Sequence, residues 1–202
     1  TTRLTSYGRA GDDEITGGSN RDYLRGDAGE DTLSGNDGND GNDNLYGGDD
    51  NDKLSGDAGN DRLYGENGND VISGGDGADQ LIGGAGADEL RGGDGNDRLY
   101  VDGDDTVIDG GDGIDRVDVQ GTDAVNIDMA ASSVEQAFGN AGDDTFDGSG
   151  LSARMTSYGR DGDDTITGGS NRDNLRGDAG NDTVAAGDGN DYAYGGTGND
   201  TV

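Results

Sequence analysis

The sequence predicts an all-β fold in which the chain coils into a solenoid of short parallel strands. The main observation is a nine-residue repeat, G-G-x-G-x-D-x-U-x with U apolar, of which three copies run without interruption through residues 74–100. Within each copy, the x-U-x triplet has the in–out alternation of a short strand, and the glycine-rich hexad has the composition of a turn. Only 27% of the residues are apolar and 5% aromatic, which is too little for a thick core.

Charge and composition narrow the classes of function. The 202 residues include 45 acidic and 13 basic side chains, a net charge of −32, which repels nucleic acid and attracts cations. Cysteine and histidine are absent, so disulfides and thiolate or imidazole metal sites are excluded. No apolar run approaches the roughly 20 residues that span a bilayer, and no signal peptide is recognisable. We therefore expect neither a nucleic acid partner nor a transmembrane segment.

An aspartate at the sixth position of each repeat is the candidate metal ligand. The eighteen are Asp13, Asp22, Asp31, Asp43, Asp52, Asp61, Asp70, Asp79, Asp88, Asp97, Asp105, Asp115, Asp144, Asp164, Asp173, Asp182, Asp191 and Asp200. Two places after each stands an apolar residue, with Ala193 the weakest member. A disordered acidic linker is the alternative, but such a linker would not keep an apolar side chain in this phase.

The repeat resembles the repeats-in-toxin (RTX) family, the haemolysin-type calcium-binding nonapeptides. The resemblance implies a right-handed parallel β-roll with two repeats per turn, in which calcium ions lie in the turns between successive coils. It also implies that the sixth-position carboxylates and main-chain carbonyls hold these ions, roughly one per repeat. Such oxygen ligands suit calcium, which takes 6–8 of them, better than magnesium.

Glycine at the fourth position is replaced by Asn20, Asp50 and Asn171 in three repeats. Asparagine and aspartate are the residues that best tolerate left-handed backbone after glycine. We therefore expect left-handed geometry at all three positions.

The nonapeptide repeat is interrupted at two places, and these interruptions suggest how the chain divides into segments. Residues 35–46 contain twelve residues rather than nine, so either Asp40 or Asp43 could be the ligand, with Asp43 keeping its spacing to the next apolar residue. Between Asp115 and Asp144 the repeat lapses. We expect β-roll over residues 1–118 and 142–202, separated by residues 119–141.

The segment 119–141 has two interpretations. Its apolar and polar residues alternate as in strands, which favours larger, calcium-free coils that extend the solenoid. Phe138 and Phe146 would then fill the added interior. A separate linker is the alternative.

A longer period also runs through the chain. Residues 5–9 recur as 156–160 and residues 17–22 as 168–173, both with an offset of 151. Residues 142–202 therefore read as the start of a second copy of a superunit of ~151 residues. We expect the chain to be a segment of a longer protein.

Ninth-position residues suggest a possible contact stripe. Tyr46, Tyr64, Ile82 and Tyr100 follow one another on alternate repeats and would face outward on one side of the solenoid. Cross-strand stacking that stabilises the sheet is one interpretation. A surface for lateral packing or adhesion is the other.

These observations predict a structural or binding module rather than an enzyme, because the same carboxylate recurs in every repeat and no catalytic site is singled out. We expect a calcium-dependent module of a secreted or cell-surface protein, such as an adhesin, surface-layer or filament component, that folds on calcium binding. The alternative is the calcium-binding C-terminal module of a secreted protease, lipase or polysaccharide epimerase, with catalysis elsewhere. The resemblance implies an extracellular location and type I secretion. Besides calcium, candidate partners are other copies of the chain and an extracellular polymer.

Overall fold

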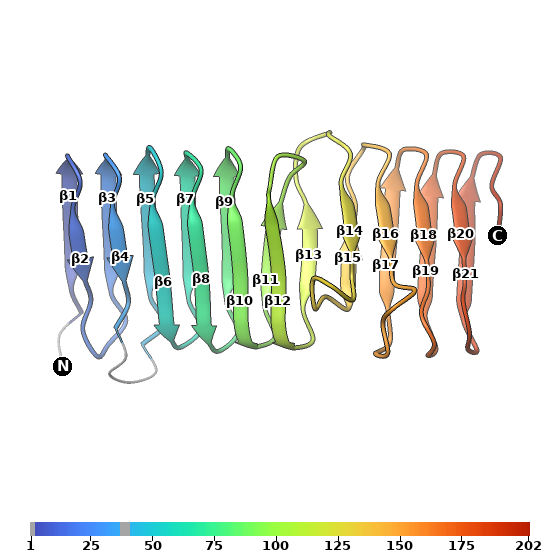
Figure 1. Ribbon diagram of the computed structural model, residues 1–202, viewed down its shortest axis with the longest axis horizontal. Coiled ribbons are helices and arrows are strands. Elements are labelled where there is room, and N and C mark those ends of the chain that lie inside the picture. The colour runs from blue at the N-terminus through green and yellow to red at the C-terminus, as the bar shows by residue number, and fades with distance from the viewer. Residues whose placement is uncertain (1–2, 37–40) are drawn as a thin grey trace. The chain divides into compact units, whose positions relative to one another are not determined.

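The computed structural model describes residues 3–36 and 41–202, which form two compact units, Thr1–Gly113 and Ile114–Val202 (Figure 1). The regular structure of the described residues is entirely strand. In this part of the chain, no helix is long and apolar enough to cross a membrane.

In the first unit, successive strands alternate between two parallel sheets (Figure 1). The first sheet contains β1 (Thr5–Ala10), β3 (Tyr23–Ala28), β5 (Asn44–Asp49), β7 (Arg62–Asn67), β9 (Gln80–Ala85) and β11 (Arg98–Val101). The second contains β2 (Glu14–Thr16), β4 (Thr32–Ser34), β6 (Lys53–Ala58), β8 (Val71–Asp76), β10 (Glu89–Gly95) and β12 (Val107–Gly113). Each coil therefore contributes one strand to each sheet, as in a β-solenoid.

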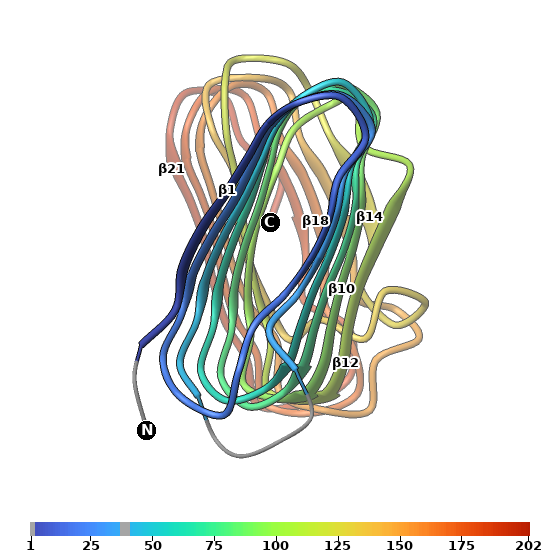
Figure 2. The same ribbon diagram turned by 90° about the vertical axis from the view of Figure 1, so that its left-hand side faces the viewer.

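The strand register confirms that two nonapeptides make one coil. Leu63 pairs with Leu81 and Leu81 with Leu99 in the first sheet, while Leu54 pairs with Ile72 in the second. Figure 2 looks along the first unit and shows its coils superimposed, with the two sheets as the long sides of a flattened ring. The predicted parallel β-roll is confirmed.

A single file of apolar side chains from each sheet fills the first unit. The central residue of each x-U-x triplet points inward because side chains alternate along a strand. The buried members include Leu24, Leu33, Leu45, Leu54, Leu63, Ile72, Leu81, Leu90 and Leu99. Each contributes about 1.5–3 kcal/mol by burial, and the small number of such residues per coil leaves the core thin.

The twelve-residue repeat changes the spacing of one coil. Leu24 pairs with Leu45 and Leu33 with Leu54, an offset of 21 residues in both sheets. Asp43 keeps its place two residues before Leu45, whereas Asp40 lies outside the described residues. The added residues are therefore accommodated without loss of register in the coils that follow.

The second unit repeats the two-sheet pattern. One sheet contains β13 (Arg116–Val119), β15 (Gln136–Phe138), β17 (Thr156–Asp161), β19 (Asn174–Ala179) and β21 (Tyr192–Thr197), and the other contains β14 (Asn126–Asp128), β16 (Thr145–Asp147), β18 (Thr165–Thr167) and β20 (Thr183–Ala185). Residues 119–141 contribute strands to this unit. Arg116 pairs with Gln136 and Gln136 with Thr156, so these coils are two residues longer than a regular coil.

The two phenylalanines of these longer coils lie on opposite sides of the backbone. Phe146 is fully buried, as expected. The expectation for Phe138 is wrong, because Ala137 takes the inward position of β15 and strand alternation turns Phe138 outward. There its ring meets that of Tyr158 edge to face, with centroids 5.1 Å apart, and lies 3.8 Å from the guanidinium carbon of Arg116.

Candidate metal sites in the turns

The sixth-position aspartates form ladders along the turns. In each ladder, Oδ1 of one aspartate accepts the main-chain N–H of the aspartate one coil earlier. The N–H of Asp43 donates to Asp61 at 2.6 Å, and that of Asp61 donates to Asp79 at 2.7 Å. On the alternate repeats, the N–H of Asp52 donates to Asp70 at 2.8 Å. The carboxylates therefore stack at the spacing of the coils.

Strand alternation explains why these carboxylates face inward. An aspartate two places before the inward apolar residue points to the same side of the backbone. Asp79, two places before Leu81, is 1% exposed. Fourteen of the eighteen aspartates are buried: Asp22, Asp31, Asp43, Asp52, Asp61, Asp70, Asp79, Asp88, Asp97, Asp115, Asp144, Asp164, Asp173 and Asp182. Asp13, Asp105, Asp191 and Asp200 are partly exposed.

Most of these aspartates have a second carboxylate oxygen that is buried. Within residues 3–36 and 41–202, Oδ2 has no hydrogen-bond partner in Asp13, Asp31, Asp52, Asp61, Asp70, Asp79, Asp88, Asp164 and Asp182. A buried carboxylate oxygen without a partner is costly. Its repetition from coil to coil is what a row of cation sites in the turns would require.

The first glycine of the repeat brings a second oxygen close to this one. A methyl group on Gly74 would collide with Oδ2 of Asp79 and with the carbonyl oxygen of Gly92, one coil later. The same holds for Gly56, where the colliding atoms belong to Asp61 and Gly74. Two acceptors from successive coils thus face one small space that only glycine leaves open.

Carboxylate and carbonyl oxygens are the hard ligands that calcium prefers, so the residues present fit this ion. No group of three acidic side chains that could hold a metal lies among the described residues. Each ion would therefore depend on main-chain carbonyls for most of its coordination, together with the aspartates of neighbouring coils.

Burial and neighbouring charge make the ladders electrostatically unfavourable without a cation. Burial, with a smaller contribution from aspartates of adjacent coils, raises the pKa of Asp52, Asp61 and Asp164 to about 7. Burial also raises the pKa of Asp70 and Asp79 to about 6. A bound divalent ion would reverse this effect and hold the carboxylates ionised.

Left-handed backbone shapes most of the turns. Gly75 and Gly77 have φ angles of +110° and +140°, and Asp50 has the expected left-handed φ of 79°. The same expectation is wrong for Asn20 and Asn171, whose φ angles are not positive. In their turns the carboxylate is held by a main-chain N–H instead, which gives the turn another shape.

Two ladder positions differ from the sequence prediction. Asp105 lies 17 residues after Asp88 rather than 18, and Thr106 occupies the regular ladder position. The N–H of Asp88 still donates to Oδ1 of Asp105, at 3.3 Å. Glu135 was missed: its carboxylate accepts the N–H of Asp115 at 2.9 Å, as a ladder aspartate would. The signal was its place two residues before the buried Ala137.

The possible contact stripe lies on the outer face of the first sheet. Tyr46, Tyr64, Ile82 and Tyr100 are successive register partners. The rings of Tyr46 and Tyr64 are stacked, with centroids 4.6 Å apart and planes at 3°. The structure thus aligns the four side chains in one row.

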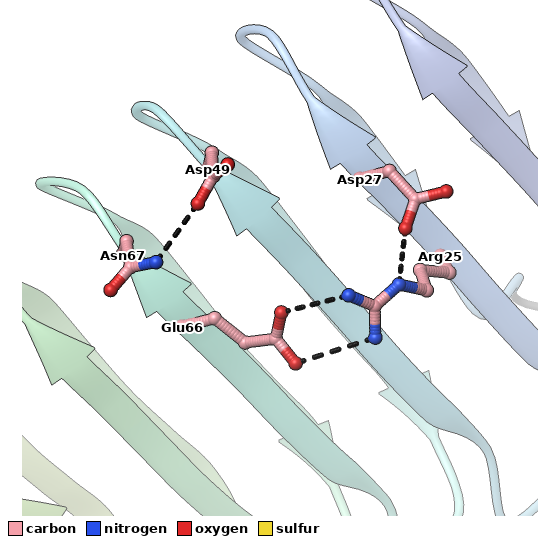
Figure 3. A network of polar contacts seen from close by, with 5 residues as sticks. All are labelled: Arg25, Asp27, Asp49, Glu66 and Asn67. Carbon is pink, nitrogen blue, oxygen red and sulfur yellow. Dashed lines mark hydrogen bonds and ion pairs between the residues drawn. The ribbon is translucent and has the colours of Figure 1, made fainter.

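An arginine network borders this row. Arg25 on β3 forms an ion pair with Asp27 and reaches across β5 to Glu66 on β7, with its Nη2 atom 3.2 Å from Oε2 (Figure 3). The guanidinium carbon of Arg25 also lies 6.0 Å from the ring centroid of Tyr46. Aromatic rings and locally paired charges therefore share this face.

Comparison with known proteins agrees with the turn geometry. The family model described as RTX calcium-binding nonapeptide repeat matches residues 7–40, 37–72, 73–108, 82–117, 135–150, 156–184 and 167–202. No curated protein matches the chain. RTX repeats are typical of extracellular proteins. Because the matches cover well over half of the sequence, the chain belongs to the RTX calcium-binding nonapeptide repeat family and is a calcium-binding repeat module.

Proposed function

We propose that this chain is a structural module of a secreted or cell-surface protein, such as an adhesin, surface-layer or filament component, and that it folds when it binds calcium outside the cell. The observation that carries the proposal is the row of buried carboxylate oxygens that lack a partner within the described part of the chain, such as Oδ2 of Asp61, Asp70 and Asp79. These oxygens need a cation before the coils can stack at neutral pH.

The coupling of folding to calcium follows from the balance of forces. Burying an ionised carboxylate without a counter-charge costs several kcal/mol, and this cost recurs in successive coils. The thin apolar core offers little to offset it. Cation binding removes the cost only in the folded state, because the ligands come from different coils, and binding should therefore drive folding.

Repetition favours a structural role over catalysis. Strands β1 to β4 recur as β17 to β20 with the sequence offset of 151, which suits a protein whose function depends on length and surface. The ladder aspartates are equivalent from coil to coil, and none is distinguished as a catalytic acid or base. We propose that this chain is not itself a catalyst and that type I secretion exports it.

The outer face of the odd-numbered strands is the proposed contact surface, with other copies of the chain or an extracellular polymer as partner. All eight tyrosines lie on these strands, at residues 7, 23, 46, 64, 100, 158, 192 and 194. The tyrosine-free even-numbered strands present small residues such as Ser55 and Ser73 at the corresponding positions. Aromatic residues gathered on one face are typical of contact surfaces.

A calcium titration followed by far-UV circular dichroism tests the folding proposal. The calcium-free chain at pH 7.5 should be disordered, and calcium should produce the strand spectrum in a cooperative transition. Magnesium serves as the control and should be much less effective, because it gives up its water reluctantly. A strand spectrum that is complete in calcium-free buffer would contradict the proposal.

The gene that encodes the full protein tests the structural role. Further copies of the 151-residue unit would support an adhesin or filament. A catalytic domain joined to a single array would instead support the module of a secreted enzyme.

A further inference from the structure

Besides Asp105 in its shortened turn, three ladder aspartates use both carboxylate oxygens within the protein. Oδ2 of Asp22 accepts the N–H of Gly18 at 2.5 Å, that of Asp144 accepts Asn140 N–H at 3.0 Å, and that of Asp173 accepts Gly169 N–H at 2.8 Å. Each donor is the second residue of the same turn. We call the turns 17–22, 139–144 and 168–173 the closed turns.

The closed turns share a feature of the coil that precedes them. The residue one coil earlier, whose N–H donates to Oδ1 of the aspartate, is apolar in all three cases. It is Leu4 for Asp22, Val125 for Asp144 and Met155 for Asp173. In all three closed turns, the ladder residue of the preceding coil therefore has no carboxylate.

Turns with an unpartnered oxygen have the opposite properties. In eight turns an acidic residue precedes the aspartate on the ladder, as Asp61 precedes Asp79, and Oδ2 of the later aspartate is buried without a partner in the described chain. These later aspartates are Asp31, Asp52, Asp61, Asp70, Asp79, Asp88, Asp164 and Asp182. We call these turns open. The shortened turn at Asp105 is an exception, because the N–H of Asp102 reaches Oδ2 there although Asp88 precedes it.

The backbone separates the two kinds of turn. The second residue is left-handed in the open turns even where it is not glycine, with φ of 69° at Asp57, 79° at Glu66 and 81° at Arg160. In the closed turns, Gly18, Asn140 and Gly169 have no positive φ. Left-handed backbone costs roughly 1–2 kcal/mol for a residue with a side chain, so the open turns of Asp61, Asp70 and Asp164 contain strain that a ligand must offset.

We infer that calcium binds only at the open turns, and that the turns of Asp22, Asp144 and Asp173 fold without it. An ion at a turn needs an unpartnered Oδ2 from the aspartate of that turn. Where an apolar residue precedes that aspartate on the ladder, there is no second carboxylate to be neutralised. The carboxylate instead accepts the N–H of the second residue of its own turn. Since Leu4 and Met155 are 151 residues apart, as are Asp22 and Asp173, one such calcium-free turn recurs in each superunit. The inference rests on the proposed role of the ladder carboxylates as calcium ligands.

Isosteric substitutions in the full chain test this map. Asp164→Asn and Asp182→Asn change open turns, while Asp173→Asn changes the closed turn between them, and all three aspartates are 1% exposed. Bound calcium per chain is measured by equilibrium dialysis and atomic emission at saturating calcium, with circular dichroism as the check on folding. Each open-turn variant should lose at least one ion, and Asp173→Asn should lose none. Loss of an ion from folded Asp173→Asn would overturn the inference.

A second measurement needs no variant. In the folded parent, the side-chain carboxyl ¹³C resonances are compared between the calcium-loaded and cadmium-loaded forms. Those of Asp164 and Asp182 should shift when the metal is exchanged, and those of Asp22 and Asp173 should not. Equal shifts at both kinds of turn would overturn the inference. A parent that binds no calcium would instead refute the proposed function.

Discussion

Asp61 and Asp79 lie one coil apart, and the main-chain N–H of Asp61 donates to Oδ1 of Asp79 at 2.7 Å while Oδ2 of Asp79 stays buried without a partner in the described chain. One side chain thus has two tasks. One oxygen fixes the stacking of successive turns, and the other is the one that we propose binds a cation. This division explains why the repeat needs an aspartate, which presents two acceptors on a short side chain, at this position.

Substituting Asp79 by asparagine should separate these two tasks. Asparagine retains a carbonyl oxygen for the N–H of Asp61 but removes the charge. Loss of one charged ligand, worth about 1.5 kcal/mol or more, should raise the calcium concentration at the folding midpoint by about tenfold for the affected site and make the transition less cooperative. Circular dichroism during a calcium titration measures both.

The control for this variant is Asp94→Asn, which removes an exposed carboxylate from a neighbouring turn. It should leave the midpoint within about twofold, because exposed charges are screened by water and salt. If Asp79→Asn titrates like the parent and like Asp94→Asn, Asp79 is not a ligand.

Acid should partly replace calcium. In the folded state, burial raises the pKa of Asp52, Asp61 and Asp164 to about 7 from the ordinary value of 3.8. Protonation of these carboxylates therefore favours the folded state. The stability that it contributes is complete below pH 3.8 and is lost as the pH rises through 7. Calcium-free protein should show more strand structure at pH 4.5 than at pH 8, as measured by circular dichroism.

The same linkage predicts proton release when calcium binds. At pH 6, calcium must displace protons from these carboxylates, so the folding midpoint should lie at higher calcium than at pH 8. Titrations in two buffers of different ionisation enthalpy would measure the release by calorimetry. A calcium-free strand signal that grows as the pH rises would contradict the assigned direction of the pKa shifts.

Much of the fold could be predicted because the repeated aspartate and the repeated apolar residue stand two places apart, so both point to the same side of a strand. An aspartate two places before an apolar residue, as in Asp79 and Leu81, implies an inward pair on a strand, and the structure buries both. The choice of Asp43 over Asp40 also followed from phase, since Leu45 is buried two places after Asp43. Periodicity therefore predicts both the core and the ladders of the regular coils.

Features that depend on the neighbouring coil could not be predicted in this way. The turns at Asn20 and Asn171 are closed by a main-chain N–H of the same turn, and this choice depends on which residue lies one coil earlier. The outward position of Phe138 depends on Ala137 taking the core position. Glu135 was missed because only aspartates were considered, although its spacing matched the ladder.

Alanine at the second position of the repeat should have opposite effects in open and closed turns. Gly75 has φ +110°, and a Cβ atom there would collide with the carbonyl of Asp57. Gly75→Ala should therefore raise the calcium midpoint by several-fold and lower the thermal unfolding temperature. Gly18 is not left-handed, and its Cβ would meet only Oδ2 of Asp22 at 3.5 Å. Gly18→Ala should be neutral or stabilising by up to about 1 kcal/mol.

This pair of variants tests the turn geometry by thermal unfolding in saturating calcium. The two parent residues are both glycine at the second position of the repeat, so composition alone predicts equal effects. Equal destabilisation by Gly18→Ala and Gly75→Ala would show that the two kinds of turn do not differ in backbone as described.

The tyrosine face should contribute to association as well as to stability. Replacing both Tyr46 and Tyr64 by serine removes a stacked pair that contributes about 0.5–1.5 kcal/mol, so unfolding in calcium should require less denaturant. If the face is a contact surface between copies, the variant should also lose self-association of the calcium-loaded chain in sedimentation velocity. Ser73→Ala, on the outer face of β8 in the other sheet, is the control and should leave both properties unchanged. Denaturant unfolding reports the stacking within one chain, whereas sedimentation reports the contact between chains. A double variant that is less stable but associates like the parent would therefore show that the rings only stabilise the sheet.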